Sequence, residues 1–409
     1  MSAEALARRN VWILTIAQAL GASGPPIIFS LGGIVGQMLA PNPALVTLPI
    51  SLYSFGLALG TLPAAAIMRR NGRRTGYLIG ATLGLIAGLM ASYGIVLASF
   101  LVFCLGTFLA GFYGSYVQSY RFAAADAATG SFKAKAISWV MIGGLIAAVI
   151  GPQLVIWTRD AFPQAPFAGS FLSQAGLALL AIPVLLLLRT QEAVPAPGPT
   201  SPKGKGGRSL REILATPRFV IAVAAGMVSY GLMTFVMTAA PIAMVGCGFT
   251  IGEAAFGIQW HVLAMFAPSF FTGNLIARFG KEKITALGLL MIVTAGITAL
   301  SGLTLAHFYG ALILLGFGWN FAFIGATAMV TDCHTAEERS RVQGLNDFLV
   351  FGSVACASFF SGALLNAAGW QTINWLIFPI VALMLVPILW QMKAAESAAA
   401  RASTRAKDA

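Results

Sequence analysis

Long apolar stretches separated by short polar turns follow one another along the chain almost to its end. Each stretch has about 20 residues or more, which is the length that an α-helix needs to cross the hydrocarbon core of a bilayer. The strict alternation of apolar and polar residues that a membrane β-barrel requires is missing from the sequence. The pattern therefore predicts an all-α integral membrane protein with about twelve transmembrane helices. The predicted spans cover residues 10–39, 44–68, 76–96, 97–119, 135–158, 170–189, 217–244, 253–277, 283–306, 308–331, 345–367 and 370–392.

A change of composition divides these spans into two equal sets. Between Arg189 and Arg218 the segment EAVPAPGPTSPKGKGGRS is rich in proline, glycine, serine and lysine, which is typical of a flexible linker. The segment around Glu212 that follows predicts a short amphipathic helix on the membrane surface. The predicted parts are an N-terminal six-helix bundle (1–190), a cytoplasmic linker (191–216), a C-terminal six-helix bundle with the candidate metal site (217–394) and a cytoplasmic tail (395–409).

Two landmarks recur in both halves of the chain. A basic loop around Gly72, with the sequence RRNGRR, follows the second span, and a loop around Gly280, with the sequence ARFGKEK, follows the eighth. The second landmark is an aspartate followed at equal distances by two basic residues: Asp126 by Lys133 and Lys135, and Asp332 by Arg339 and Arg341. Both landmarks recur after nearly the same number of residues, which indicates an internal repeat. Such repeats are typical of transporters that bind substrate near the membrane midplane.

Composition and charge agree with a membrane location. The chain is 58% hydrophobic and only 9% charged, whereas soluble domains carry about 25% charged residues. The net charge of +12 does not point to nucleic acid, because all of the 25 lysines and arginines except Arg159 fall on the predicted cytoplasmic side. This distribution follows the positive-inside rule and predicts a multi-pass protein of the bacterial inner membrane with both termini in the cytoplasm. The lipid bilayer is then its main partner, and we expect a monomer.

Charged side chains are missing from the middle of every predicted span. Asp347 and Glu253 lie at the mouths of spans, and Arg121 and Asp126 follow the fourth span. Carriers of organic anions and proton-coupled carriers usually hold a charge inside the membrane, so these classes become less favoured. The chain shows no nucleophile–base arrangement, phosphate loop or cofactor motif, so we predict no enzyme activity and no cofactor. Apart from the residues considered next, we expect a membrane interior almost bare of side chains that could hold a polar cargo.

Four soft donors stand out against this background. Met233 and Met237 are one helical turn apart in the seventh span, and His261 and Met265 repeat the spacing in the eighth. A four-residue spacing puts both members of a pair on one helical face. The two spans run in opposite directions, and Met233 and His261 differ in predicted depth by only about 4 Å. Thioethers and a neutral imidazole favour a soft metal, so these residues predict a Cu(I) site inside the membrane.

Each of these residues also has a purely structural explanation. Methionine fills gaps in apolar cores, so the Met233/Met237 pair alone is a weak signal. A histidine near the centre of a bilayer needs a stronger reason, and His261 therefore carries most of the inference. Its structural explanation is a neutral imidazole that hydrogen-bonds to a neighbouring helix.

Weaker candidates extend the same chemistry toward both membrane surfaces. Met227 lies in the seventh span on a different face, Met244 continues the face of the methionine pair outward, and Cys247 follows in the outer loop. On the cytoplasmic side, Cys333 and His334 could pass copper to a cytoplasmic chaperone. A solvated loop with a chance Cys-His pair is the better explanation of these last two residues.

The two basic loops resemble the signature loop of the major facilitator superfamily, G-x-L-x-D-R-x-G-R-R/K. The resemblance extends over essentially the whole chain and implies two pseudo-symmetric six-helix bundles that work by alternating access. The acidic residue of the family's loop is replaced by Arg69 in the first half and by Ala277 in the second. The chain therefore departs from the family at a position that normally helps to lock one conformational state.

The Met233/Met237 and His261/Met265 pairs resemble, residue for residue, the signature of the CcoA-type bacterial copper importers of this superfamily. That resemblance implies import of copper, as Cu(I), for assembly of the cbb3-type cytochrome oxidase. Copper is then a transported substrate and not a cofactor. Riboflavin carriers related to this family lack the pairs, so uptake of a neutral or aromatic metabolite such as riboflavin is the first alternative. A membrane copper sensor or chaperone that binds without translocating is the second.

Overall fold

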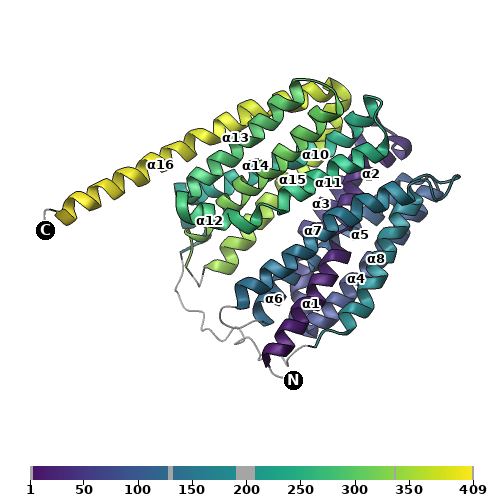
Figure 1. Cartoon of the computed structure of the whole chain (residues 1–409), viewed down its shortest axis with the longest axis horizontal. Coiled ribbons are helices and arrows are strands. Elements are labelled where there is room, and N and C mark those ends of the chain that lie inside the picture. The colour runs from purple at the N-terminus through teal and green to yellow at the C-terminus, as the bar shows by residue number, and fades with distance from the viewer. Residues whose placement is uncertain (1–2, 128–131, 190–207, 336–337, 408–409) are drawn as a thin grey trace.

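Helices make up all the regular structure in the described part of the chain. The computed structural model describes residues 3–127, 132–189, 208–335 and 338–407. Figure 1 shows long helices packed side by side in alternating directions. The elements are α1 (Ala3–Gly21), α2 (Gly24–Leu39), the 3-10 helix η1 (Pro43–Leu45), α3 (Leu48–Asn71), α4 (Arg73–Val96), α5 (Phe100–Gln118), α6 (Tyr120–Ala127), α7 (Phe132–Thr158), α8 (Ala168–Leu186), α9 (Leu210–Leu214), α10 (Pro217–Gly246), α11 (Ile251–Phe266), α12 (Ser269–Phe279), α13 (Lys281–Leu300), α14 (Leu305–Thr331), α15 (Arg339–Trp375) and α16 (Ile377–Lys407).

Two helical bundles make up the molecule. α1–α8 form the N-terminal half, and α10–α16 form the C-terminal half (Figure 1). Among the described residues, ten helices are long and apolar enough to cross a membrane, and the bent pair α11–α12 brings this number up to eleven. α16 starts with a shorter apolar segment, Ile377–Lys393, where the last span was expected. The predicted all-α membrane fold is confirmed, whereas residues 190–207 of the linker region lie outside the described residues.

Two of the expected spans are broken beside a proline. The expected span 10–39 consists of α1 and α2, and α2 has Pro25 and Pro26 in its first turn. The expected span 253–277 consists of α11 and α12, which meet at 42° next to Pro268. Proline has no N–H to donate, and its ring clashes with the preceding turn, so a continuous helix is interrupted there.

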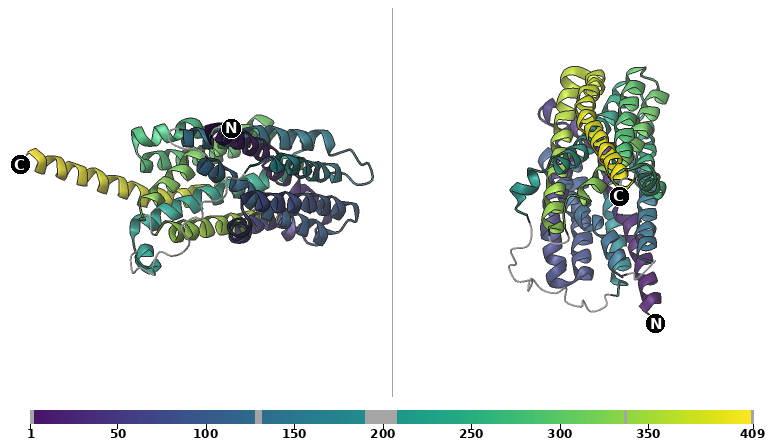
Figure 2. Two further views of the ribbon diagram at one scale, coloured as in Figure 1. Left: turned by 90° about the horizontal axis from the view of Figure 1, so that it is seen from below. Right: turned by 90° about the vertical axis from the view of Figure 1, so that its left-hand side faces the viewer.

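The end of the chain also differs from expectation. α15 continues as far as Trp375 and turns sharply at Gly369, which has a φ of 78°. Glycine suits this position because it has no Cβ to clash in the left-handed region. α16 then continues as a helix to Lys407, beyond the expected end of the bundle at residue 394, and Figure 2 shows it extending away from the other helices.

The two basic loops are matching turns between helices. Gly72 joins α3 to α4 with a φ of 81°, and Gly280 joins α12 to α13 with a φ of 94°. Such a positive φ again favours glycine over other residues. These two turns and the C-terminal end of α14 at Thr331 lie at one end of the molecule, which we call the basic end.

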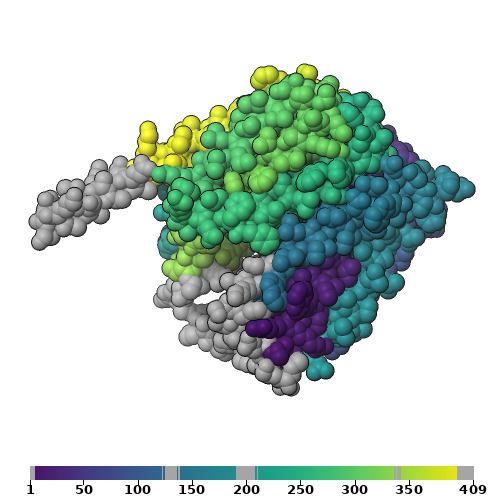
Figure 3. Space-filling model, in the orientation of Figure 1, coloured from purple at the N-terminus to yellow at the C-terminus, as the bar shows by residue number. Residues whose placement is uncertain are grey.

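The two halves touch each other at the end opposite the basic end. Ser51 of α3 and Ser358 of α15 bring their hydroxyl oxygens to 3.2 Å, and the Gln153 amide of α7 donates to Gln259 of α11 at 2.9 Å. Figure 3 shows the surfaces of α7 and α11 in contact. Two further hydrogen bonds cross between the halves here, from Thr47 to the Phe359 carbonyl (3.3 Å) and from Asn366 to the Pro43 carbonyl (3.0 Å). The molecule is therefore closed at this end.

Candidate functional site

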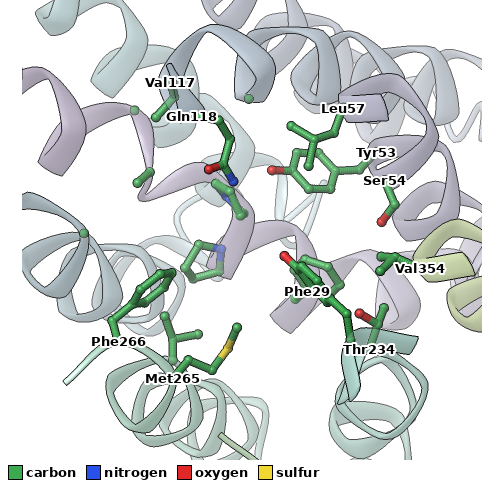
Figure 4. A pocket seen from close by; sticks show the side chains of 18 of the residues that line it. Phe29, Tyr53, Ser54, Leu57, Val117, Gln118, Thr234, Met265, Phe266 and Val354 are labelled. Atoms are coloured by element: carbon green, nitrogen blue, oxygen red, sulfur yellow. The ribbon is translucent and has the colours of Figure 1, made fainter. Parts of the chain in front are cut away.

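A central cavity lies between the two halves. Its empty volume is about 1160 Å³ when the open solvent at its mouth is included. The lining residues come from α1, α2, α3, α5, α6 and α7 of the N-terminal half and from α10, α11 and α15 of the C-terminal half (Figure 4). Arg121 of α6, near the basic end, is one of them. Because the opposite end is closed, the cavity opens toward the basic end.

Three of the four predicted copper ligands line this cavity. Met233 and Met237 lie on α10, and Met265 lies on α11. Their side chains are well packed, with only 1%, 4% and 6% of each residue exposed. Figure 4 shows Met265 directed toward the open space. We call these three residues the thioether wall.

His261 is not among the lining residues. It is fully buried against α14, where its Nδ1 lies 2.7 Å from the Leu312 carbonyl oxygen. Gly316 of α14 allows this approach, because a Cβ there would lie 2.6 Å from the His261 carbonyl oxygen. The imidazole ring therefore makes a hydrogen bond to a neighbouring helix, which is the structural explanation expected for a histidine at this depth.

This hydrogen bond fixes the tautomer of His261. A carbonyl oxygen only accepts, so Nδ1 carries the proton, and in the neutral ring Nε2 keeps its lone pair. Nε2 is buried and has no hydrogen-bond partner in the described part of the chain. A metal-binding histidine usually has this arrangement, with its second nitrogen donating to a carbonyl or carboxylate. His261 is thus competent as a ligand although its ring faces α14.

The weaker candidates in α10 and beyond lie outside the cavity wall. Met227 is half-buried against the C-terminal core, and Met244 is fully buried within it. Cys247 is exposed just after the end of α10. In the described residues, no three histidine, cysteine, aspartate or glutamate side chains gather into a possible metal site.

The loop with Cys333 and His334 is organised by an ion pair. The Cys333 thiol donates to the carbonyl one turn earlier (3.3 Å), and the His334 Nδ1 lies 3.0 Å from the carbonyl of the next residue. Arg208, just before α9, contacts the Cys333 carbonyl at 2.7 Å and the Glu338 carboxylate at 2.9 Å. The hydrogen bonds from Arg208 lower the pKa of Glu338 to about 2. Both candidate ligands thus contact the backbone, and the His334 Nε2 is buried without a hydrogen-bond partner in the described residues.

Neutral polar side chains also line the cavity. Gln18, Tyr53 and Gln118 come from the N-terminal half, and Tyr230 and Thr234 come from α10. The expectation of a membrane interior almost bare of polar side chains is therefore wrong. A count of charged residues overlooks tyrosine, glutamine and threonine, which can face a cavity from any span. Their grouping becomes visible only when the helices are packed.

Arg121 gives the cavity a charge near its mouth. It lies on the short helix α6, which follows the fourth span and reaches the cavity. Asp347 of α15 and Tyr230 of α10 lie within electrostatic range of its guanidinium group. The sequence shows Arg121 beyond the end of a span, and nothing in its spacing indicates that α6 contributes to the cavity.

Comparisons with known proteins point to one family. The chain matches the model of the Major Facilitator Superfamily over residues 11–332 and 228–408. It is similar to the riboflavin transporter RfnT of Brucella anthropi, with 66% identity over 98% of this chain and 100% of that protein. It is also similar to YdeG of Bacillus subtilis, an uncharacterized MFS-type transporter, with 28% identity over 94% of this chain and 92% of that protein. A mutant of the nucleoside transporter NupG shares the fold, with a TM-score of 0.73, 15% identity and coverage of 93% of this chain and 99% of that chain.

Proposed function

The chain belongs to the major facilitator superfamily of transporters, and we propose that it takes up riboflavin or a closely related flavin by alternating access. The full-length similarity to a riboflavin transporter, at 66% identity, carries this proposal. This similarity favours riboflavin uptake, the first alternative from the sequence, over the copper import that the methionine and histidine pairs suggest. We place the basic end in the cytoplasm by the positive-inside rule. The conformation described above is then the inward-facing one.

The cavity supports an organic cargo by its size and its walls. Residues from nine helices of the two halves line it, whereas the ligands of a single metal ion lie only about 2.0–2.3 Å from the metal. Phe29, Tyr53, Tyr230, Phe266 and Phe351 supply aromatic faces around it. Aromatic rings attract other planar rings in stacked or edge-to-face arrangements. A flat tricyclic ring with a polar chain suits such a space.

Riboflavin uptake can be measured in a bacterial strain that cannot make the vitamin. We expect this chain to restore growth at low external riboflavin and to raise uptake of radiolabelled riboflavin by at least about tenfold over a strain with an empty vector. The same cells should not accumulate an unrelated neutral solute. No gain in riboflavin uptake, with the protein present in the membrane at normal level, would contradict the proposal.

Copper is a second candidate cargo, and one specific observation favours it. Three thioethers line one side of the cavity, and the nearby His261 keeps a buried nitrogen lone pair without a partner. Soft sulfur donors prefer Cu(I), and weak thioether ligands allow the ion to leave again. On this proposal copper enters as substrate, passes the thioether wall and reaches a cytoplasmic chaperone for oxidase assembly. A sensor that binds copper without moving it is disfavoured by the transporter family.

Substitution of the soft donors separates the two cargoes. Met233→Leu keeps the volume and apolar character of the side chain, so a carrier of riboflavin should lose less than about threefold in uptake. A copper carrier should lose at least about tenfold in uptake of radioactive copper with Met233→Leu or His261→Ala. Both variants and wild type are compared in the same cells at equal protein level. Normal copper uptake by both variants would remove copper as a cargo bound at these residues.

A further inference from the structure

The side of the cavity away from the thioether wall carries hydrogen-bonding groups without partners. Tyr53 of α3 is only 5% exposed and Gln118 is exposed, and neither the Tyr53 hydroxyl nor the Gln118 amide has a hydrogen bond within the described ranges of the chain. Figure 4 shows the Gln118 amide of α5 and the Tyr53 hydroxyl pointing toward each other across open space, with Met265 on the other side. A Cβ at Gly114 would lie 3.1 Å from the Tyr53 hydroxyl, so the glycine leaves room beside this group.

The C-terminal half adds matching groups from α10. The Tyr230 hydroxyl lies within electrostatic range of Tyr53 and of Arg121. Its ring is held edge-on by Trp319 and Phe323, at centroid distances of 5.1 and 5.0 Å, so its position is well defined. One turn further along α10, the Thr234 hydroxyl is buried and has no partner in the described residues. Polar groups from both halves therefore line the cavity, and those from α10 lie on the same helix as Met233 and Met237.

Buried hydroxyl groups, such as those of Tyr53 and Thr234, nearly always have hydrogen-bond partners in folded proteins. The Gln118 side chain is exposed at the cavity, so its amide is accessible to cargo or water. When several such groups face a cavity without partners from the protein, the cargo or water must supply them. A soft ion such as Cu(I) prefers sulfur donors and has little use for hydroxyl and amide groups. The arrangement instead suits the edge of a planar heterocycle with alternating carbonyl oxygens and N–H groups. A glutamine amide can bind a neighbouring donor and acceptor on such an edge simultaneously, as it does with adenine.

We propose that Tyr53, Gln118 and Tyr230 determine specificity by binding the carbonyl- and N–H-bearing edge of a flavin ring. The methyl-substituted edge of the ring then packs against the thioether wall, where sulfur makes favourable contacts with aromatic rings. This inference rests on the proposed riboflavin uptake and adds the orientation of the cargo to it. Because Tyr53 and Gln118 belong to one half and Tyr230 to the other, the bound ring bridges the two halves.

Two variants and one flavin analogue test this orientation. Tyr53→Phe and Gln118→Met remove the polar groups and keep much of the side-chain volume. We expect each to raise the KM of riboflavin uptake by about tenfold with little change in maximal rate, because sites built for hydrogen bonding discriminate strongly against a missing partner. Tyr93→Phe is the matched control, since Tyr93 is 58% exposed and is not among the cavity-lining residues. It should leave the KM unchanged.

The analogue is riboflavin methylated at the ring nitrogen between the two carbonyl groups. In wild type, the analogue should inhibit uptake of labelled riboflavin about tenfold more weakly than unlabelled riboflavin does. In Gln118→Met, the two compounds should inhibit this uptake to within about twofold of each other. This ratio is measured within one variant, so reduced folding does not affect it. If wild type takes up riboflavin but both variants keep its KM and its discrimination, the orientation is wrong. If wild type takes up no riboflavin, the proposed function fails, and the orientation fails with it.

Discussion

Replacing Gly362 with alanine is expected to reduce uptake by at least about tenfold, by holding the carrier open at the end opposite the basic end. A Cβ at Gly362 of α15 would lie 2.3 Å from the Thr47 Oγ1 and 2.4 Å from its Cγ2. Thr47 is in the other half, so this clash exists only while the two halves touch. Thr47 is β-branched and therefore has few rotamers with which to avoid the added methyl group. The substitution thus raises the free energy of one state and shifts the population to the other.

Uptake is measured together with labelling of a cavity cysteine, Val354→Cys, in a background in which the native cysteines are replaced by serine. In the Gly362→Ala variant, a membrane-impermeant thiol reagent added outside the cell should label this cysteine faster. Gly352→Ala on the same helix is the control, because a Cβ there meets nothing within 4 Å. Adding Thr47→Ala should restore uptake by making room. Unchanged labelling and uptake in Gly362→Ala would show that the contact does not close the carrier.

A disulfide across the same contact is expected to abolish uptake by locking the opposite state. The hydroxyl oxygens of Ser51 and Ser358 are 3.2 Å apart, and both residues are buried. Cysteine differs from serine by one atom, and disulfides form where the Cβ atoms lie about 3.5–4.5 Å apart. Ser51→Cys with Ser358→Cys should therefore cross-link α3 of one half to α15 of the other under oxidation. With the halves joined at this end, the cavity can open only toward the basic end.

Oxidised cells that carry the double variant should show less than about a tenth of wild-type uptake, and a reductant should restore it. Each single variant should be insensitive to the oxidant. Cys356 lies close in sequence to Ser358 and is exposed, so the background again has serine at the native cysteines. Mass spectrometry establishes the cross-link. Normal uptake by fully cross-linked protein would mean that transport does not need separation of the halves at Ser51 and Ser358.

The sequence predicted the membrane fold because its signals are local. A span reveals itself by about 20 apolar residues in a row, and the turns at Gly72 and Gly280 reveal the repeat by their basic neighbours. The same reasoning located Met233, Met237 and Met265, since a helical repeat puts residues four apart on one face. These three side chains do share a cavity wall.

The orientation of His261 and the polar groups opposite the thioethers depend on packing instead. His261 and Met265 are four residues apart, yet only Met265 lines the cavity, because Gly316 lets α14 approach the His261 turn closely. Spacing within one helix cannot reveal which neighbour will fill that place. Tyr53 and Gln118 come from different helices and share no motif. Methionine is equally suited to a copper ion and to the edge of an aromatic ring, so the choice of cargo could not follow from the methionine spacing alone.

The contact that closes the carrier has a consequence for its environment. The hydrogen bonds that join the halves there link serine, glutamine, threonine and asparagine side chains with each other or with carbonyl groups, all of them uncharged. Salt largely screens interactions between exposed charges that lie farther apart than a Debye length of about 8–10 Å, but it hardly affects neutral hydrogen bonds. Neutral groups of this kind also do not titrate near neutral pH. These hydrogen bonds are thus insensitive to the salinity and acidity of the medium outside the cell, whereas the Arg159 guanidinium, which lies beside Gly252 of the other half, is a charged group at the same end that salt can screen.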